Sequence, residues 1–352
     1  MNKVRILQKF WAVAIAFSFF ACESSDIEIP LGEFERGVLV MNEGNFGTND
    51  GEVFHYNPET NEVKANIFET HNTRPFAGLL EDMVLVDDRL YLVANTGKVE
   101  IVNANDFSGI GAVSTGSDQP RSIAVAGGKL FISDWGPYDA NFATPNSYIS
   151  VVNNVQGGNI SKKIPVSRKP EGMFALDNRV LVAVTQDRAM QVIDVATEEV
   201  VETRQITGAP HSFFEVNGQL YLYARDANNV YFHRIDRNNY TVTATVTAAI
   251  QRSTNRYALG RDNDMYVVTS TGWPDYNDAV SRISISTGEV LNASLITGSG
   301  IYGIGYDQAN RQLYLGDNNA FQGNGTVLIY NEEGQEVRSF EAGRAPSGFL
   351  FR

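Results

Sequence analysis

The chain has 352 residues, 43% of them hydrophobic, so it is long enough to bury a substantial core. Its 41 acidic residues outnumber its 28 lysines and arginines, and the formal net charge of −13 makes nucleic acids and other polyanions poor partners. A single cysteine excludes a disulfide within the chain, so stability has to come from the core.

The first 21 residues have the pattern of a secretory signal peptide. Three basic residues precede an uncharged apolar stretch over 10–21, which is too short to span a membrane comfortably. This stretch ends at Ala21, directly before Cys22, and a small residue before a lone cysteine indicates a bacterial lipobox. We therefore expect Cys22 to be a lipid anchor; the alternative is an ordinary signal peptide followed by a chance cysteine.

Loss of residues 1–21 would remove three basic residues and no acid, leaving 25 Lys and Arg against 41 Asp and Glu, a net charge of −16. Residues 22–35 are then expected to form a lipid-anchored linker. Residues 36–352 form the folded part, in which short apolar and β-branched runs alternate with turns and no stretch keeps the period of an amphipathic helix.

Recurring short sequence patterns divide residues 36–352 into units of 40 to 50 residues. A polar residue followed by two apolar ones begins one strand of six units. These polar residues are Arg89, Lys129, Arg179, Gln219, Asp264 and Gln312. Asn, Asp or Ser follows a later apolar run, where its side chain can close a turn, and a proline opens most units.

A period of this length with about four short strands per unit predicts a β-propeller, and seven copies fit the folded part. The first unit, beginning at Val38, lacks a leading strand, whereas the chain ends in an orphan strand over 346–351. The sequence therefore predicts an all-β, seven-bladed β-propeller, closed by pairing of the C-terminal strand with the first blade. A pair of β-sandwiches is the alternative, and it does not explain one period over the whole length.

The proline-opened units and motifs such as Val-Ile-Asp at 192–194 resemble YncE-like seven-bladed propellers over nearly all of the folded part. More narrowly, the Asn-Glu-Gly-Asn-Phe segment at 42–46 resembles Bacteroides-type surface lipoproteins of this fold. Some of those capture cobalamin beside a TonB-dependent outer-membrane transporter. The acidic residues after Cys22 resemble a signal for export to the outer face of the outer membrane, so the resemblance implies a lipid-anchored, surface-exposed protein.

Four units carry enlarged loops between their second and third strands, at 42–51, 134–147, 270–278 and 317–325. In a propeller these loops emerge on the same face as the starts of the inner strands. Aromatic side chains in polar loops are typical recognition anchors, although the rings could instead fold back and plug the loops. The predicted aromatic contacts are Phe46, Trp135, Tyr138, Phe142, Trp273, Tyr276 and Phe321.

Alignment of the inner-strand starts gives one residue per blade, expected at one mouth of the central channel. These are Glu81, Arg121, Glu171, His211, Asn255, Tyr302 and Ser347. Such a set suits either a ligand site or a hydrated channel. Arg121, His211, Glu171, Asn255 and Tyr302 are the predicted ligand contacts, and Arg74 and Arg344 are expected as further donors on this side.

A lactonase-like enzyme is the catalytic alternative, since Glu81, Glu171 and Asn255 could hold a divalent cation. Arg121 would lie beside that cation, and the neighbouring residues do not follow the lactonase pattern. The sequence has no Gly-x-Ser-x-Gly elbow, and His55 and His233 fall within predicted strands. We therefore predict no catalytic residue, no metal site and no cofactor.

The resemblance implies an outer-membrane lipoprotein that binds a bulky nutrient on its loop-rich face and passes it to a TonB-dependent transporter. A cobamide is the most specific candidate, because aromatic walls with amide and cationic donors suit a broad, amide-fringed corrinoid. A glycan binder, in which Trp135 and Trp273 stack on sugar rings, is one alternative. A propeller that contacts only protein partners is the other.

Overall fold

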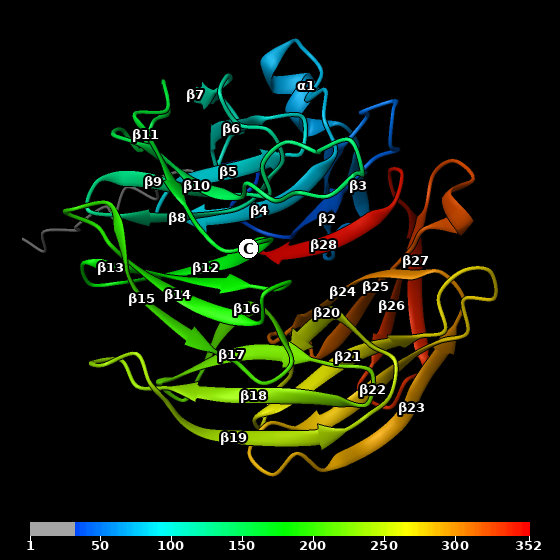
Figure 1. The fold of residues 1–352 in the computed structure, drawn as a ribbon. Coiled ribbons are helices and arrows are strands. Elements are labelled where there is room, and N and C mark those ends of the chain that lie inside the picture. Colours follow the sequence, from blue (N-terminus) through cyan, green and yellow to red (C-terminus); the bar gives the residue numbers. More distant parts are fainter. Residues whose placement is uncertain (1–31) are drawn as a thin grey trace, which may run out of the picture. The chain divides into compact units, whose positions relative to one another are not determined.

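The computed structural model describes residues 32–352, which form seven four-stranded antiparallel sheets around a common centre (Figure 1). Blade 1 contains β28 (Pro346–Phe351), β1 (Val38–Asn42), β2 (Glu52–Asn57) and β3 (Glu62–Lys64), from its inner to its outer strand. Blade 2 contains β4 (Leu80–Val86), β5 (Arg89–Ala94), β6 (Lys98–Asn103) and β7 (Gly109–Val113). Blade 3 contains β8 (Pro120–Ala126), β9 (Lys129–Asp134), β10 (Tyr148–Val152) and β11 (Lys162–Pro165).

The other four blades follow the same order. Blade 4 contains β12 (Pro170–Leu176), β13 (Arg179–Val184), β14 (Ala189–Asp194) and β15 (Glu199–Gln205). Blade 5 contains β16 (Ala209–Val216), β17 (Gln219–Arg225), β18 (Asn229–Ile235) and β19 (Val242–Ala249). Blade 6 contains β20 (Ser253–Leu259), β21 (Asp264–Ser270), β22 (Asp278–Ser284) and β23 (Val290–Gly298). Blade 7 contains β24 (Ile301–Asp307), β25 (Gln312–Asp317), β26 (Thr326–Asn331) and β27 (Glu336–Glu341).

The core lies between neighbouring blades. The second strand of a blade is covered on both faces, so in β5 both Leu90 and Tyr91 are buried although they point to opposite sides of the sheet. The outer strand β15 covers its blade on one face only and alternates exposed with half-buried residues. This explains why the second strands read as continuous apolar runs.

Pairing of β28 with β1 closes the ring, as the sequence predicts. Phe349 lies opposite Val40 and Leu350 opposite Leu39 in an antiparallel ladder, and Figure 1 shows the last strand beside the first blade. The predicted fold is therefore confirmed. Closure completes the first blade and pairs the inner edge of β1.

Within residues 32–352 two short helices interrupt the strands: α1 (Ile67–Asn72) follows blade 1, and the 3-10 turn η1 (Asn319–Phe321) lies in the loop of blade 7. In residues 32–352 neither helix has the length and apolar character needed to cross a membrane. The predicted signal peptide at 1–21 and the predicted anchor Cys22 lie outside the described residues.

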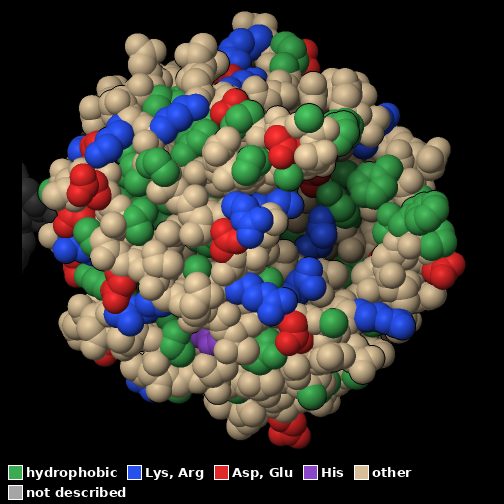
Figure 2. All heavy atoms as spheres, in the orientation of Figure 1, with side chains coloured by type: hydrophobic (Ala, Val, Ile, Leu, Met, Phe, Trp, Pro, Cys, Tyr) green, Lys and Arg blue, Asp and Glu red, His purple; other side chains and the backbone are tan. Residues whose placement is uncertain are grey.

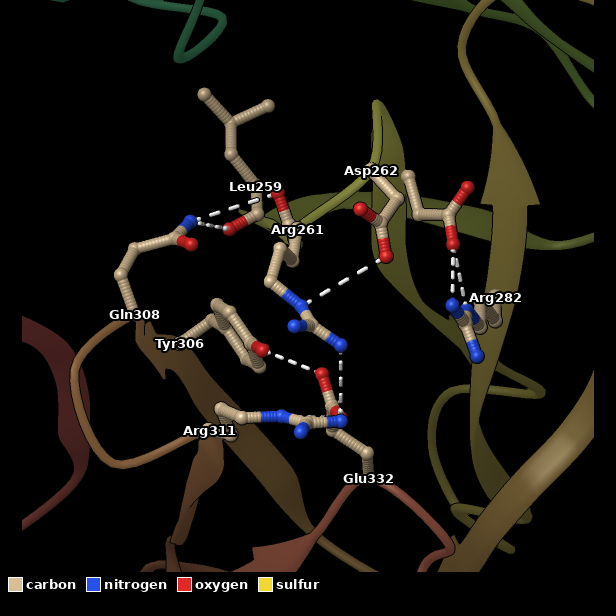
Figure 3. A network of polar contacts seen from close by, with 10 residues as sticks. Leu259, Arg261, Asp262, Arg282, Tyr306, Gln308, Arg311 and Glu332 are labelled. Carbon is tan, nitrogen blue, oxygen red and sulfur yellow. Dashed lines mark hydrogen bonds and ion pairs between the residues drawn. The ribbon is translucent and has the colours of Figure 1, made fainter.

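Polar side chains join blades 6 and 7 on the face opposite the enlarged loops (Figure 3). Glu332 accepts hydrogen bonds from Tyr306 and Arg311, and the Nη2 atom of Arg261 lies 3.8 Å from its carboxylate. The amide of Gln308 donates to the carbonyl oxygen of Leu259 at 3.0 Å. These contacts hold hairpins of blades 6 and 7 together, and they do not involve the enlarged loops.

Candidate functional site

The starts of the inner strands meet at a cavity of about 510 Å³, which we call the mouth pocket. All seven residues that the alignment placed at the channel mouth line it. Its full lining is Met41, Glu43, Glu81, Arg121, Trp135, Glu171, His211, Asn255, Arg256, Tyr257, Tyr302, Ile304 and Ser347. The sequence alignment thus identified one contributor from every blade.

A β-bulge explains why these seven side chains converge. In each blade the ladder between the inner and second strands skips the aligned residue; in blade 3, for example, Pro120 pairs with Asp134 and Ser122 with Ser133, leaving Arg121 unpaired. The ladders of the other six blades also shift at the aligned residue; they skip one residue in four blades, two in blade 4 and three in blade 6. An extra residue in one strand turns its side chain out of the regular alternation, here toward the channel.

The 134–147 loop brings Trp135 into the pocket. The Asp134 carboxylate accepts backbone hydrogen bonds from Asp118, Gln119 and Gly136 at 2.7–2.8 Å, which fixes the start of the loop. The indole lies under the Arg121 guanidinium, 4.4 Å from the ring centroid, and under Lys169 at 4.5 Å. Trp135 is half-buried and lines the mouth pocket, so its ring is a packed wall of that pocket.

Arg121 lies between two carboxylates. Its Nη1 is 2.7 Å from Oε1 of Glu81, and its Nε is 3.6 Å from Oε2 of Glu171. Burial raises the pKa of Glu81 to about 7 against the opposing effect of Arg121, and nearby Glu43 and Glu171 add to the rise. Burial also raises the pKa of Glu171. The Arg121 guanidinium is therefore shared by the carboxylates of Glu81 and Glu171. Near neutral pH, Glu81 can gain or lose a proton.

His211 is neutral at physiological pH. Burial and the nearby cations Arg121, Arg225 and Arg256 lower its pKa to about 3. Its Nε2 lies 4.0 Å from Glu171, too far for a hydrogen bond, and its buried Nδ1 has no partner in residues 32–352. The imidazole can thus offer a donor or an acceptor to a ligand.

The residues considered for a lactonase-like cation do not fit one. Arg121 pairs with Glu81 and faces Glu171, while Oδ1 of Asn255 accepts a hydrogen bond from Nε of Arg225 at 2.8 Å. Guanidinium groups therefore face the oxygens that a cation would need. Across residues 32–352, no group of three His, Cys, Asp or Glu side chains could share a metal ion.

A second cavity of about 490 Å³ adjoins the mouth pocket and shares Arg256 and Tyr302 with it. We call it the arginine pocket, because Arg225 and Arg252 also line it. The predicted contacts Tyr276 and Phe321 belong here, and the Phe321 ring meets Tyr302 edge-on at 5.2 Å. Tyr302, which lines both cavities, donates a hydrogen bond to Oε2 of Glu43 in the mouth pocket at 2.6 Å.

The remaining predicted aromatic contacts, Phe46, Tyr138, Phe142 and Trp273, line neither cavity and are exposed. Trp273 is 82% exposed and, unlike Trp135, does not line the mouth pocket. In the orientation of Figure 2, Lys and Arg side chains gather near the middle of the visible face, although the whole chain is acidic.

The two further donors expected on this side, Arg74 and Arg344, both lie close to an acid. Arg74 forms a bidentate ion pair with Glu100 at 2.8 Å, and Arg344 lies 3.7 Å from Asp50; neither lines the mouth pocket. Conversely, sequence reasoning missed Glu43, Arg225 and Arg256. Arg256 directly follows the aligned residue Asn255, and this position in the sequence was the signal that could have identified it as a pocket residue.

The fold is shared with several solved structures. The periplasmic gluconolactonase of Pseudomonas aeruginosa superposes with a TM-score of 0.66 at 13% identity, covering 90% of this chain and 98% of that one. A quinonprotein alcohol dehydrogenase-like protein from Bacteroides thetaiotaomicron gives 0.65 at 14% identity, covering 90% and 78%. A putative 6-phosphogluconolactonase from Bacteroides uniformis gives 0.65 at 11% identity, covering 90% and 99%. At these identities the likeness concerns the fold alone.

A search of functionally characterised proteins finds no sequence match. The profile of one family, described as a domain of unknown function (DUF5074), matches residues 36–351, which is nearly the whole ring. This chain belongs to that family.

Proposed function

We propose that this protein is a binding protein that captures a bulky small molecule over the mouth pocket and the enlarged loops. The main support is the distribution of exposed aromatic side chains. In residues 32–352, the large aromatic residues that are exposed all lie in the four enlarged loops of one face: Phe46, Tyr138, Phe142, Trp273 and Phe321. Exposed apolar groups gathered on one face are typical of an interaction site.

Polar groups at the centre of this face favour binding over catalysis. Arg121 engages Glu81 and faces Glu171, and His211 has a pKa of about 3, so it is a weak general base. These side chains can donate hydrogen bonds to, and accept hydrogen bonds from, a ligand rich in amides or hydroxyls. A broad hydrophobic rim around a polar centre suits a cobamide, the ligand implied by the resemblance to cobalamin-capturing lipoproteins.

The proposal extends to the cell envelope. A lipid on Cys22 would hold the protein at the outer membrane, where it would pass its ligand to a TonB-dependent transporter. Replacing Cys22 with Ser should release the protein into the soluble fraction. A Cys22→Ser protein that still sediments with membranes would contradict the anchor, and failure to co-purify with any such transporter would contradict the transfer step.

Calorimetric titration of the purified protein with cobalamin, haem and a set of oligosaccharides tests the binding function. We expect cobalamin to bind, and Trp273→Ala to weaken it by about tenfold or more, because truncation of an aromatic anchor typically costs on the order of 2 kcal/mol. Leu291→Ala is the matched control, since Leu291 is also exposed but lies on the outer strand β23. Binding of an oligosaccharide alone would favour the glycan alternative.

A further inference from the structure

In the described part of the chain, three arginines but only one acid, Asp278, line the arginine pocket. Arg225, Arg252 and Arg256 all line it, and within residues 32–352 none of the three forms an ion pair with a carboxylate. The neighbouring Arg121 contrasts with them, since it pairs with Glu81. Three unpaired guanidinium groups around one cavity are notable in a chain with a net charge of −13.

Neighbouring side chains hold two of these guanidinium groups in place. Nε of Arg225 donates to Oδ1 of Asn255 at 2.8 Å, and the Arg256 guanidinium stacks over the Tyr302 ring at 3.9 Å from its centroid. Stacking uses the face of a guanidinium and leaves its N–H edge available. A ligand that accepts hydrogen bonds from these edges would therefore find donors that are already ordered.

A second observation in the same cavity points to a ligand. Asp278 is only 4% exposed; its Oδ2 accepts from the backbone N–H of Ile301 at 2.8 Å, but its buried Oδ1 has no partner in the described part of the chain. An unpaired buried carboxylate oxygen costs free energy, and a hydroxyl or amide of a ligand would satisfy it. Tyr276 and Phe321 supply an apolar wall beside it.

We propose that the arginine pocket binds an oxyanion, a carboxylate or phosphate group, carried by the ligand whose body covers the mouth pocket. This inference rests on the proposed function and specifies the chemistry of the ligand. Guanidinium groups match both oxyanions through paired N–H donors. A ligand hydroxyl or amide next to the oxyanion would donate to Asp278.

Calorimetry with phenyl phosphate and benzoate tests the oxyanion site in the full-length protein, with benzyl alcohol as the neutral analogue. We expect at least one of the two anions to bind, more weakly as the salt concentration rises, and the neutral alcohol not to bind. Binding of phenyl phosphate alone identifies a phosphate site, and binding of benzoate alone identifies a carboxylate site. Equal binding of all three probes, or of none, would overturn the inference.

Arginine variants make the test specific. Arg252→Gln and Arg256→Gln should each weaken binding of the anion by about tenfold or more, since a charge-assisted hydrogen bond is lost. Arg252 is exposed, so its loss should not disturb the fold, whereas Arg256 is half-buried. The matched control is Arg188→Gln, which makes the same charge change at an exposed residue outside the pocket. Unchanged affinity in both pocket variants would refute the site.

The outcome is separable from that of the proposed function. A ligand from the cobalamin and oligosaccharide screen that binds equally well to the parent, Arg252→Gln and Arg256→Gln, in a protein that binds neither anion, would overturn the oxyanion site alone. Anion binding that depends on these arginines, in a protein that binds nothing in the screen, would support the oxyanion site and contradict the proposed ligands.

Discussion

Glu52 is a buried acid at the first residue of β2, directly after the enlarged loop at 42–51. Its Oε1 accepts backbone hydrogen bonds from Val53 at 2.9 Å and Phe68 at 3.1 Å, but burial outweighs these and raises its pKa to about 7. Because the folded protein binds this proton more tightly than the unfolded chain does, Glu52 should lower stability as the pH rises from about 4.5 to 7.

Glu52→Gln tests this pH dependence. The amide keeps an oxygen acceptor for Val53 and Phe68 but carries no charge at any pH. We expect the variant to be more stable than the parent at pH 8, by up to about 3 kcal/mol, and to lose this advantage at pH 4.5. Denaturant unfolding at both pH values measures the difference, and parallel pH profiles of the two proteins would contradict the shift.

The two tryptophans of the loop face should behave differently when truncated. Trp135 packs between Arg121 and Lys169, so Trp135→Ala should lower the free energy of unfolding by about 1–3 kcal/mol. Trp273 is exposed, and Trp273→Ala should change it by less than about 0.5 kcal/mol. Equal losses of stability in thermal unfolding would show that Trp273 also plugs its loop.

At the scale of strands and loops, the bulge at the start of each inner strand decides which residues reach the mouth pocket. Repeated marks in the sequence placed Glu81, Arg121 and His211 at equivalent positions, and that was sufficient to predict that they converge. The bulge itself was not predictable, because it depends on the register with the second strand. For the same reason Arg256, within the longer bulge of blade 6, was missed.

Gly316 in β25 permits close packing of blade 7 against β28. A Cβ atom on Gly316 would lie 2.0 Å from the carbonyl oxygen of Pro346, a clash that requires the backbone to move. Gly316→Ala should therefore destabilise the fold by about 1–3 kcal/mol or more. Gly298→Ala is the matched control, since its Cβ would meet only ordinary contacts at 3.5 Å. Equal unfolding midpoints in urea would contradict this role.

For the whole molecule, closure by β28 is the feature on which the ring depends. Deleting residues 346–352 would remove the inner strand of blade 1, expose the edge of β1 and uncover core residues such as Tyr314, against which Phe349 and Phe351 pack. We expect the shortened protein to aggregate or to lose its cooperative unfolding transition. An unchanged melting temperature would show that closure contributes little.

The ring could be predicted from the sequence because every blade repeats the same local pattern, and the unpaired strand at 346–351 indicated how it closes. The site was harder to predict, because pockets depend on contacts between blades. The exposure of Trp273 and the packing of Trp135 are opposite outcomes for the same residue type in similar loops. Likewise, the sequence predicts Arg74 as a donor at the site but does not reveal that Glu100 pairs with it.

Hydrogen–deuterium exchange, with and without the compound that binds most tightly among cobalamin, haem and the oligosaccharides, would locate ligand capture on the ring. We predict slower exchange in the loops at 42–51, 134–147, 270–278 and 317–325 and at the inner-strand starts around the mouth pocket. Slower exchange confined to the opposite face, where Glu332 joins blades 6 and 7, would contradict capture at the loop face, as would a failure of every compound to bind.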